Sequence, residues 1–323
     1  MTDLLTFGET ALRLSPPGSG RLETTDRLEV WATGAESNVA IAASRLGADV
    51  TWTSKLADTP LGRRAVAELR GHGLTTAVTW ADDPGARQGL TFFERGSEPR
   101  ENFVLDDRHG TAVESVTPGD LPMDDVQAAE AVFVSGETVA LSGSVAETAQ
   151  AVLRAAGGTS VLGLDYRADL WSADDARERL TELFPAVDVF VTNEDQAKRV
   201  LKKTGEAPEI AHQLGSEYDF ETVVVTKSDR GALVWHESTI HERDAVETDP
   251  VEATGQHDAF TGAFLGRRLA GDDIAGALAH GVAAAALART IPGPVPTVNP
   301  GEVEAIVERL DAGAPGGAGG PLR

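Results

Sequence analysis

Residues 254–258 place a glycine turn and a carboxylate directly at the start of a helix. A strongly helical pattern begins at or near Asp258, immediately after the turn that contains Gly255. Backbone N–H groups at a helix start bind phosphate oxygens, and the helix dipole favours the same anions. A carboxylate beside such an anion site can take the proton from an alcohol that attacks phosphorus. Aspartate is also a common N-cap, so this segment alone leaves Asp258 either catalytic or structural.

Motifs near both ends of the chain support the catalytic interpretation. Towards the C-terminus, the pattern Asp-Thr-x-Gly-Ala-Gly-Asp-Ala-Phe is matched at Gly255, Asp258, Ala259 and Phe260, with Thr254 at its variable position. Towards the N-terminus stand residues 34–40, then Leu46-Gly47 and Pro60-Leu61-Gly62. These are the two signatures of the PfkB (ribokinase-like) carbohydrate kinases, which the chain resembles in order and spacing from about residue 3 to residue 310.

The resemblance implies an ATP-dependent sugar kinase, with ATP and Mg²⁺ as cofactors and a dependence on K⁺ that the sequence leaves open. Asp258 would remove the proton from a primary sugar hydroxyl while the γ-phosphoryl group of ATP is transferred in line. The amides of Gly255, Gln256, His257 and Asp258, together with magnesium, would neutralise charge on the phosphoryl oxygens. These four residues are the predicted catalytic set.

Gln256 and His257 depart from the family signature, which has Ala-Gly at these positions. Main-chain amides can still bind an anion if the backbone at His257 tolerates a side chain, whereas a glycine-specific conformation would strain it. A protonated His257 could add positive charge beside the transferred phosphoryl group, or its imidazole could be a spectator.

On the sugar side, the resemblance places the substrate between the N-terminal motif and Asp258. Gly34 allows close backbone approach, and the Asn38 amide can both donate and accept hydrogen bonds. An ordinary helix start is the alternative interpretation of this motif. The predicted substrate-binding residues are Gly34, Ala35, Asn38, Phe92, Asp107, Arg108, Arg167 and Asp258.

On the nucleotide side, residues 223–232 resemble the strand and turn that hold ATP in the family, although Ser228 stands where glycine is commoner. Asn193 begins a segment that matches the family's magnesium and phosphate region, in which Gln196 replaces an acid. His280 matches a position near the adenine but could equally be a packed histidine. The predicted nucleotide-binding residues are Asn193, Thr226, Ser228, Arg230, Gly231, Gly255, His257 and His280, and Glu194 is the predicted metal ligand.

Two substrates are compatible with the resemblance, because the chain is similar to both 2-keto-3-deoxygluconate kinases and fructokinases. Arg108 and Arg167 match arginines of the cleft and could bind a sugar-acid carboxylate bidentately. Asp106 and Asp107, however, stand where the sugar-acid kinases usually carry tyrosines. A carboxylate there would repel an acidic substrate by about 1 kcal/mol or more at about 4 Å. We therefore expect a neutral ketohexose such as fructose, with 2-keto-3-deoxygluconate as the alternative.

The rest of the chain supplies the elements that position these residues. Short apolar strands alternate with amphipathic helices, which predicts an α/β fold with a doubly wound, mostly parallel sheet flanked by helices. Predicted strands span residues 3–7, 50–53, 131–134, 160–164, 187–192 and 222–226. Predicted helices span residues 38–46, 60–71, 144–156, 173–183, 258–269, 273–289 and 301–310.

Two stretches, at about residues 9–33 and 87–112, interrupt this alternation with short strands that have no helix between them. They predict a small antiparallel sheet that covers the cleft as a lid or pairs with a second copy. We expect a kinase domain over residues 1–312, a homodimer formed through the lid, and a disordered tail over the glycine-rich residues 313–323.

Composition disfavours several kinds of partner. Asp and Glu total 51 against 28 Lys and Arg, and the net charge of −23 argues against nucleic acid and anionic membranes. The same charge is typical of proteins adapted to high intracellular salt. The chain has no cysteine, no run of about 18 apolar residues and no secretory signal, so we expect a cytoplasmic protein.

Two other functions are compatible with a doubly wound sheet. A non-catalytic sugar or nucleotide sensor would require the changes at Gln256, His257 and Gln196 to abolish transfer, and the intact Asp258 argues against it. A dinucleotide-dependent dehydrogenase would need Gly-x-Gly-x-x-Gly after the first strand, where residues 8–11 read Gly-Glu-Thr-Ala instead.

Overall fold

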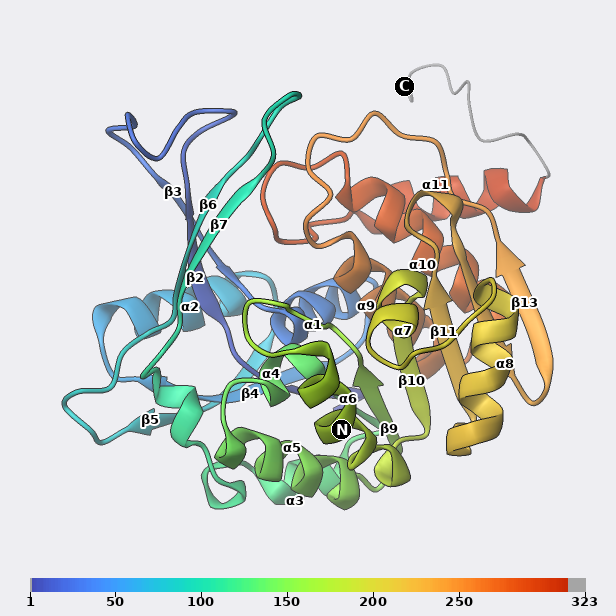
Figure 1. Ribbon diagram of the computed structural model, residues 1–323, viewed down its shortest axis with the longest axis horizontal. Coiled ribbons are helices and arrows are strands. Elements are labelled where there is room, and N and C mark those ends of the chain that lie inside the picture. The colour runs from blue at the N-terminus through green and yellow to red at the C-terminus, as the bar shows by residue number, and fades with distance from the viewer. Residues whose placement is uncertain (1, 313–323) are drawn as a thin grey trace.

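A nine-stranded sheet runs through the computed structural model, which describes residues 2–312 (Figure 1). In order across the sheet, the strands are β13 (Thr239–Arg243), β12 (Ala232–His236), β11 (Thr222–Thr226), β10 (Val189–Asn193), β9 (Thr159–Gly163), β8 (Ala131–Ser135), β1 (Leu4–Phe7), β4 (Val50–Ala57) and β5 (Thr75–Ala81). Strands β11 to β5 are parallel, and β12 pairs antiparallel with both of its neighbours. The predicted tail at residues 313–323 lies outside the described residues.

Buried β-branched residues form the centre of this sheet. Val223, Val224 and Val225 of β11 are fully buried, and their side chains alternate between two hydrophobic cores. A parallel sheet requires such burial on both faces, because the crossover helices cover it from each side.

Helices cover both faces of the sheet (Figure 1). The helices are α1 (Ala35–Arg45), α2 (Pro60–Gly71), α3 (Met123–Ala128), α4 (Gly136–Val139), α5 (Gly143–Ala155), α6 (Ala173–Thr181), α7 (Glu194–Arg199), α8 (Ala207–Tyr218), α9 (Gln256–Leu269), α10 (Ile274–Ala288) and α11 (Pro300–Asp311). One core contains residues of α1, α2, α9 and α10, and the other contains residues of α3, α5, α6, α7 and α8. None of the helices within residues 2–312 is both long and apolar enough to cross a membrane.

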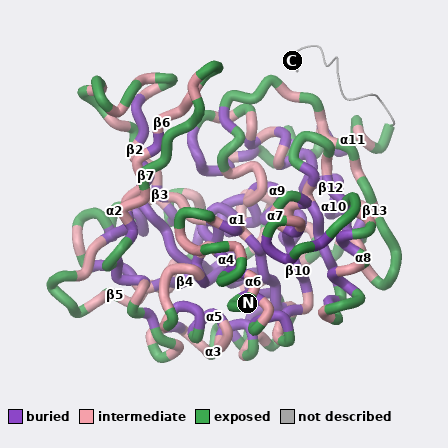
Figure 2. Tube along the Cα trace, viewed as in Figure 1, coloured by how far each residue is buried: buried purple, intermediate pink, exposed green. Residues whose placement is uncertain are grey.

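A second sheet of four strands projects from the main body as the lid (Figure 1). Its order is β3 (Glu29–Thr33), β2 (Ala11–Ser15), β6 (Leu90–Glu94) and β7 (Phe103–Asp107). The two outer pairings are antiparallel, whereas β2 and β6, which come from the two separate insertions, are parallel. The far end of the lid is largely exposed (Figure 2). The predicted doubly wound α/β fold with a small second sheet is therefore confirmed, although one pairing of that second sheet is parallel.

Candidate active site

Helices α1 and α9 bring their amino-terminal ends together. They approach closely because Gly262 of α9 faces α1, where a Cβ would lie 2.3 Å from the Val39 carbonyl oxygen. The turn before α9 also requires glycine, since Gly255 has a φ of 81° and a Cβ there would lie 2.3 Å from the Pro294 oxygen. The packing thus fixes the start of α9 beside the start of α1.

Asp258 lies in the first turn of α9 and is held by Asn38 of α1. The Asn38 amide donates to Asp258 Oδ2 at 2.8 Å and to Thr33 Oγ1 at 3.1 Å. Burial raises the pKa of Asp258 to about 7, helped by the negative charge of Asp165 and opposed by the hydrogen bond from Asn38. A carboxylate with a pKa near neutrality is suited to accept a proton from a hydroxyl.

A cleft of about 800 Å³ opens between the lid and Asp258. Six of the predicted substrate-binding residues line it: Gly34, Ala35, Asn38, Arg108, Arg167 and Asp258. The lid contributes Arg13, Thr91, Phe93, Asn102 and Val104. The volume is ample for a monosaccharide.

Phe92, which was predicted to contact the substrate, does not line this cleft. Side chains alternate along β6, and Thr91 and Phe93 hold the cleft-facing positions. Arg13 stacks on Phe93, with the guanidinium carbon 3.7 Å from the ring centroid. The prediction is wrong by one residue because the sequence did not reveal which face of the lid strand meets the cleft.

Asp107 is a second correction, because its carboxylate pairs with Arg87 Nη1 at 2.8 Å and does not line the cleft. The preceding Asp106 instead accepts hydrogen bonds from Thr91 Oγ1 at 2.6 Å and from Arg167 Nη2 at 2.8 Å. Alternation along β7 sends the two neighbouring carboxylates to opposite sides. Asp107 therefore does not exert the repulsion expected of it, whereas the carboxylate of Asp106 lies beside the cleft arginine Arg167.

Arg108 is almost fully buried, with 7 % of its side chain exposed. Its Nε donates to Glu9 Oε2 at 2.6 Å, and its Nη1 donates to Glu137 Oε1 at 2.6 Å. Arg167 is more accessible, with 34 % of its side chain exposed, and contacts Glu137 at 3.4 Å and Asp169 at 3.2 Å. Arg108 and Arg167 are thus neutralised by carboxylates of the protein itself.

Glu9 and Glu137 were missing from the predicted site. Burial raises the pKa of Glu137, but the charges of Arg108 and Arg167 outweigh burial and leave this pKa lowered overall. Each glutamate follows a glycine directly after a strand, in the pairs Gly8-Glu9 and Gly136-Glu137. Because the carboxyl ends of parallel strands form the ligand-binding edge of such sheets, this position is the signal that could have identified both residues.

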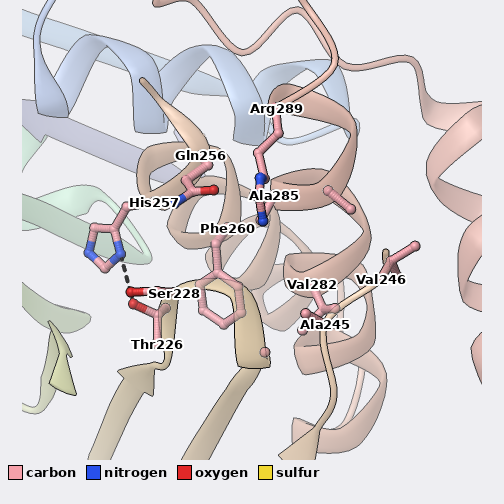
Figure 3. A pocket seen from close by; sticks show the side chains of 12 residues that line it. Thr226, Ser228, Ala245, Val246, Gln256, His257, Phe260, Val282, Ala285 and Arg289 are labelled. Atoms are coloured by element: carbon pink, nitrogen blue, oxygen red, sulfur yellow. Dashed lines mark hydrogen bonds between the residues drawn. The ribbon is translucent and has the colours of Figure 1, made fainter. Parts of the chain in front are cut away.

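A second pocket lies between β11, α9 and α10 (Figure 3). Of the predicted nucleotide-binding residues, Thr226, Ser228, Gly231 and His257 line it. Ser228 and Gly231 have left-handed backbones, with φ of 56° and 98°, and a Cβ at 231 would lie 2.1 Å from the Arg243 carbonyl oxygen. The pocket encloses about 50 Å³, so a nucleotide enters it fully only when its walls move apart.

His257 occupies the border between the pocket and Asp258. Its Nδ1 lies 3.2 Å from Thr226 Oγ1 (Figure 3), and its Nε2 lies 3.6 Å from Asp165 Oδ1. Burial lowers the pKa of His257, and the charge of Asp258 opposes that shift. His257 is the second residue of α9 and has no positive φ, so the backbone here does not depend on the glycine of the family signature.

His280 and Asn193 do not line the nucleotide pocket, contrary to prediction. His280 Nδ1 lies 2.8 Å from the Gly276 carbonyl oxygen and its Nε2 lies 3.1 Å from Glu304 of α11, so it is a packed histidine. Asn193 is the N-cap of α7, where its side chain accepts a hydrogen bond from Gln196 N at 2.8 Å. Gly255 likewise forms the turn before α9 without lining the pocket.

Glu194 and Arg230, which were predicted to bind the metal and the nucleotide, pair with each other. Glu194 Oε2 accepts from Arg230 Nη2 at 2.6 Å, and Glu194 Oε1 accepts from Lys198 Nζ at 2.6 Å. Glu194 is thus held by two cations in this structure, and its role as a metal ligand stays a prediction. The guanidinium of Arg230, bound to that carboxylate, lies outside the pocket lining.

The described residues alone do not form a magnesium site, so we expect magnesium to bind together with the phosphates of the nucleotide. Within residues 2–312, no group of three or more His, Asp or Glu side chains could hold a metal ion. Magnesium commonly keeps several waters and is bound through substrate phosphates with few protein ligands.

Comparison with models of protein families shows to which family this chain belongs. The model of the pfkB family of carbohydrate kinases matches residues 1–300, so the chain belongs to this family. It is an ATP-dependent sugar phosphotransferase, which excludes the non-catalytic sensor, and kinases of this family use ATP with Mg²⁺.

Individual kinases that are similar to this chain indicate the kind of sugar that its relatives phosphorylate. The 2-dehydro-3-deoxygalactonokinase of Haloferax volcanii is 48 % identical over 314 residues, which cover 96 % of this chain and 98 % of the relative. The 2-dehydro-3-deoxygluconokinase of Thermoproteus tenax is 31 % identical, with 96 % and 95 % covered. The crystal structure of a 2-dehydro-3-deoxygluconokinase from Thermotoga maritima has a TM-score of 0.89 at 29 % identity, covering 95 % and 100 %.

These relatives correct the predicted substrate. All three are named as kinases of 2-dehydro-3-deoxy sugar acids, so the expectation of a ketohexose such as fructose is wrong. The expectation rested on the carboxylates of Asp106 and Asp107, and the structure weakens both parts of it. Asp107 pairs with Arg87 outside the cleft lining, and the charge of Asp106 is offset by its pairing with Arg167.

Proposed function

We propose that this protein phosphorylates a 2-dehydro-3-deoxy sugar acid, with 2-dehydro-3-deoxygalactonate as the first candidate and 2-dehydro-3-deoxygluconate as the second. The observation that carries the proposal is the 48 % identity, over almost the whole chain, to a kinase named for the first of these sugars. The cleft supports it with three arginines, Arg13, Arg108 and Arg167, that line a space of sugar size.

In this proposal, Arg167 binds the substrate carboxylate. It is the more exposed of the paired cleft arginines, and a bidentate contact suits its planar guanidinium. Asp106 also contacts Arg167, but the pKa of Asp106 is raised by burial and by its neighbour Asp169. The pairing with Arg167 offsets part of the charge by which Asp106 would repel an incoming carboxylate. Arg108, held by two glutamates, would fix the shape of this end of the cleft.

At the other end of the cleft, Asp258 takes the proton from the primary hydroxyl of the sugar. Asn38 holds the base, and Gly34 and Ala35 hold the sugar from the start of α1. ATP supplies the phosphoryl group, and the amides of residues 255–258 bind the oxygens of that group as charge develops. The lid covers the cleft and excludes water, which would compete as an acceptor.

A product analysis tests this proposal. Purified protein is incubated with Mg-ATP and an equimolar mixture of 2-dehydro-3-deoxygalactonate, 2-dehydro-3-deoxygluconate and fructose, and the products are separated by mass spectrometry. We expect a phosphorylated sugar acid, with phosphorus coupled to a CH₂ group in the NMR spectrum. Phosphorylation of fructose alone, or of a secondary hydroxyl, would overturn the proposal.

The proposal includes a homodimer formed through the lid. Strand β7 is an edge of the lid sheet, and Phe103, Val104 and Leu105 on it are 52 %, 44 % and 52 % exposed. An apolar edge strand favours pairing with another strand. Sedimentation of wild type and Leu105→Glu provides the test, in which wild type should be a dimer and the variant a monomer. A wild type that is monomeric at micromolar concentration would contradict it.

The proposal also includes adaptation to high salt, supported by the net charge of −23. Salt screens the repulsion between surface carboxylates, so the protein should unfold at a higher temperature in molar KCl than in dilute buffer. Equal unfolding temperatures in the two buffers would contradict this. Replacing KCl by NaCl at the same ionic strength, in the kinase assay, tests the dependence on K⁺.

A further inference from the structure

Arg289 stands at the end of α10 and is anchored through its backbone. Its carbonyl oxygen accepts hydrogen bonds from Val251 N at 2.8 Å and Glu252 N at 3.1 Å, in the segment that leads to the turn at Gly255. The backbone therefore has a structural role that any residue at this position can keep. The side chain is separate from this role and lines the nucleotide pocket (Figure 3).

The Arg289 guanidinium has no partner within the described part of the chain. Its Nε is buried without a hydrogen bond, and no carboxylate of residues 2–312 lies within 4.0 Å of it. Neighbouring cations near the pocket are paired, since Lys227 binds Glu242 and Arg230 binds Glu194. Other arginines of the described chain also lack a carboxylate partner, but Arg289 combines a buried Nε that makes no hydrogen bond with a place in the pocket lining. Buried hydrogen-bond donors in proteins usually have an acceptor, so a bound ligand would explain why the Arg289 Nε has none among residues 2–312.

The pocket around Arg289 is otherwise neutral or weakly basic. Arg289 is the only lysine or arginine among the described residues that line it. The amino-terminal end of α9 also faces the pocket through Gln256 and His257, and its N–H groups favour an anion. Both features select the same chemistry, a negatively charged group.

We propose that Arg289 binds the phosphate chain of the nucleotide. In Figure 3 the Arg289 side chain extends from the end of α10 towards the side of the pocket where Gln256 and Phe260 lie, away from His257. The γ-phosphoryl group has to lie beside Asp258, which follows His257. Arg289 therefore contacts the α- and β-phosphates, which ADP retains, and contributes to nucleotide affinity more than to the chemical step. This inference rests on the ATP dependence of the family and is independent of the sugar.

Calorimetric titration of wild type and Arg289→Gln with ATP, ADP and adenosine tests the assignment. A lost hydrogen bond to a charged group corresponds to about a 10- to 100-fold change in affinity. We expect Kd to rise by that factor for both ATP and ADP and to stay unchanged for adenosine. An equal loss for adenosine would place Arg289 on the base or ribose, and no loss for any ligand would show that it binds none; either result would overturn the proposal.

Two further variants make the experiment decisive. Arg289→Lys keeps a positive charge and the long stem, so it should recover part of the affinity for ADP. Arg268→Gln removes the same charge from an exposed position on α9 outside the pocket and should leave all three affinities unchanged. If Arg289→Gln does not fold, the lysine variant still decides, because substitution of a residue that contacts phosphate bidentately weakens ADP binding but not adenosine binding.

Discussion

The sugar cleft and the nucleotide pocket lie on either side of Asp258 and use positive charge in opposite ways. In the sugar cleft, Arg108 and Arg167 are bound by carboxylates of the protein itself. In the nucleotide pocket, Arg289 has no carboxylate partner within residues 2–312. The sugar side is thus shaped in advance by internal ion pairs, whereas the nucleotide side keeps a cation available for its ligand.

Under the proposed function, the difference accounts for the binding of two anionic substrates by a chain with a net charge of −23. Internal carboxylates hold Arg108 rigid, so an acidic sugar meets an ordered surface and competes with Asp106 for Arg167. A nucleotide carries more negative charge and meets backbone N–H groups and Arg289 in a pocket without acidic lining residues. Three predictions test this contrast.

The largest effect is expected at the junction between the two sites. Asp258→Asn removes the base and should lower kcat by about 10²- to 10⁴-fold, because proton transfer in the transition state contributes that much. Both substrates should still bind, since an asparagine side chain is nearly the same size as the aspartate that it replaces. Rapid-quench measurement of ADP formation gives kcat, and calorimetry gives both affinities. Less than a tenfold loss of kcat would contradict the assignment of the base.

Substituting each of two arginines of the sugar cleft by methionine separates a structural arginine from a substrate-binding one. Arg108→Met leaves Glu9 and Glu137 buried without their main partner and should destabilise the fold by about 3–5 kcal/mol. Arg167 is more exposed, so Arg167→Met should destabilise the fold by about 1 kcal/mol or less. The same substitution should raise KM for the sugar acid. Urea unfolding and steady-state kinetics measure the two effects. Equal destabilisation by both variants would refute the distinction between a structural and a substrate-binding arginine.

The smallest effect is a shift of the pH profile. Asp258 acts as a base when deprotonated, and its pKa of about 7 means that kcat/KM should fall as the pH decreases through 7. The negative charge of Asp165 raises this pKa, so Asp165→Asn should move the acidic limb to lower pH. A kcat/KM profile of both proteins at constant ionic strength measures the shift. An acidic limb that stays in place would show that Asp165 does not influence the base.

Much of the fold and the position of Asp258 could be predicted because their signals are local. A buried run such as Val223-Val224-Val225 has few alternatives to a central strand. The turn before α9 needs a positive φ, which Gly255 supplies. Asp258, three residues later, then falls in the first turn of the helix. The β12–β13 hairpin was missed because its turn at Glu237 and Ser238 has two left-handed residues without the usual Asn-Gly.

The failed site predictions share a different cause. The sequence does not show which side of a strand or helix faces the site, because packing against neighbouring elements decides this. Asp106 and Asp107 both suited the cleft, and only the packing of the lid decides which one faces it. Helix α10 is so rich in alanine that its sequence shows no single buried stripe, so nothing distinguished His280 from the stripe that carries Val282 and Arg289. Contacts between distant segments, such as Glu194 with Arg230, leave no local pattern at all.

The ratio of kcat/KM for 2-dehydro-3-deoxygalactonate to that for fructose tests the central claim most directly. It is measured by coupled ADP release in molar KCl with Mg-ATP, with Asp258→Asn as the background control. We predict that wild type prefers the sugar acid by tenfold or more, because Arg167 gains a carboxylate partner that fructose cannot provide. A preference for fructose, or a loss of less than tenfold in Asp258→Asn, would contradict the account.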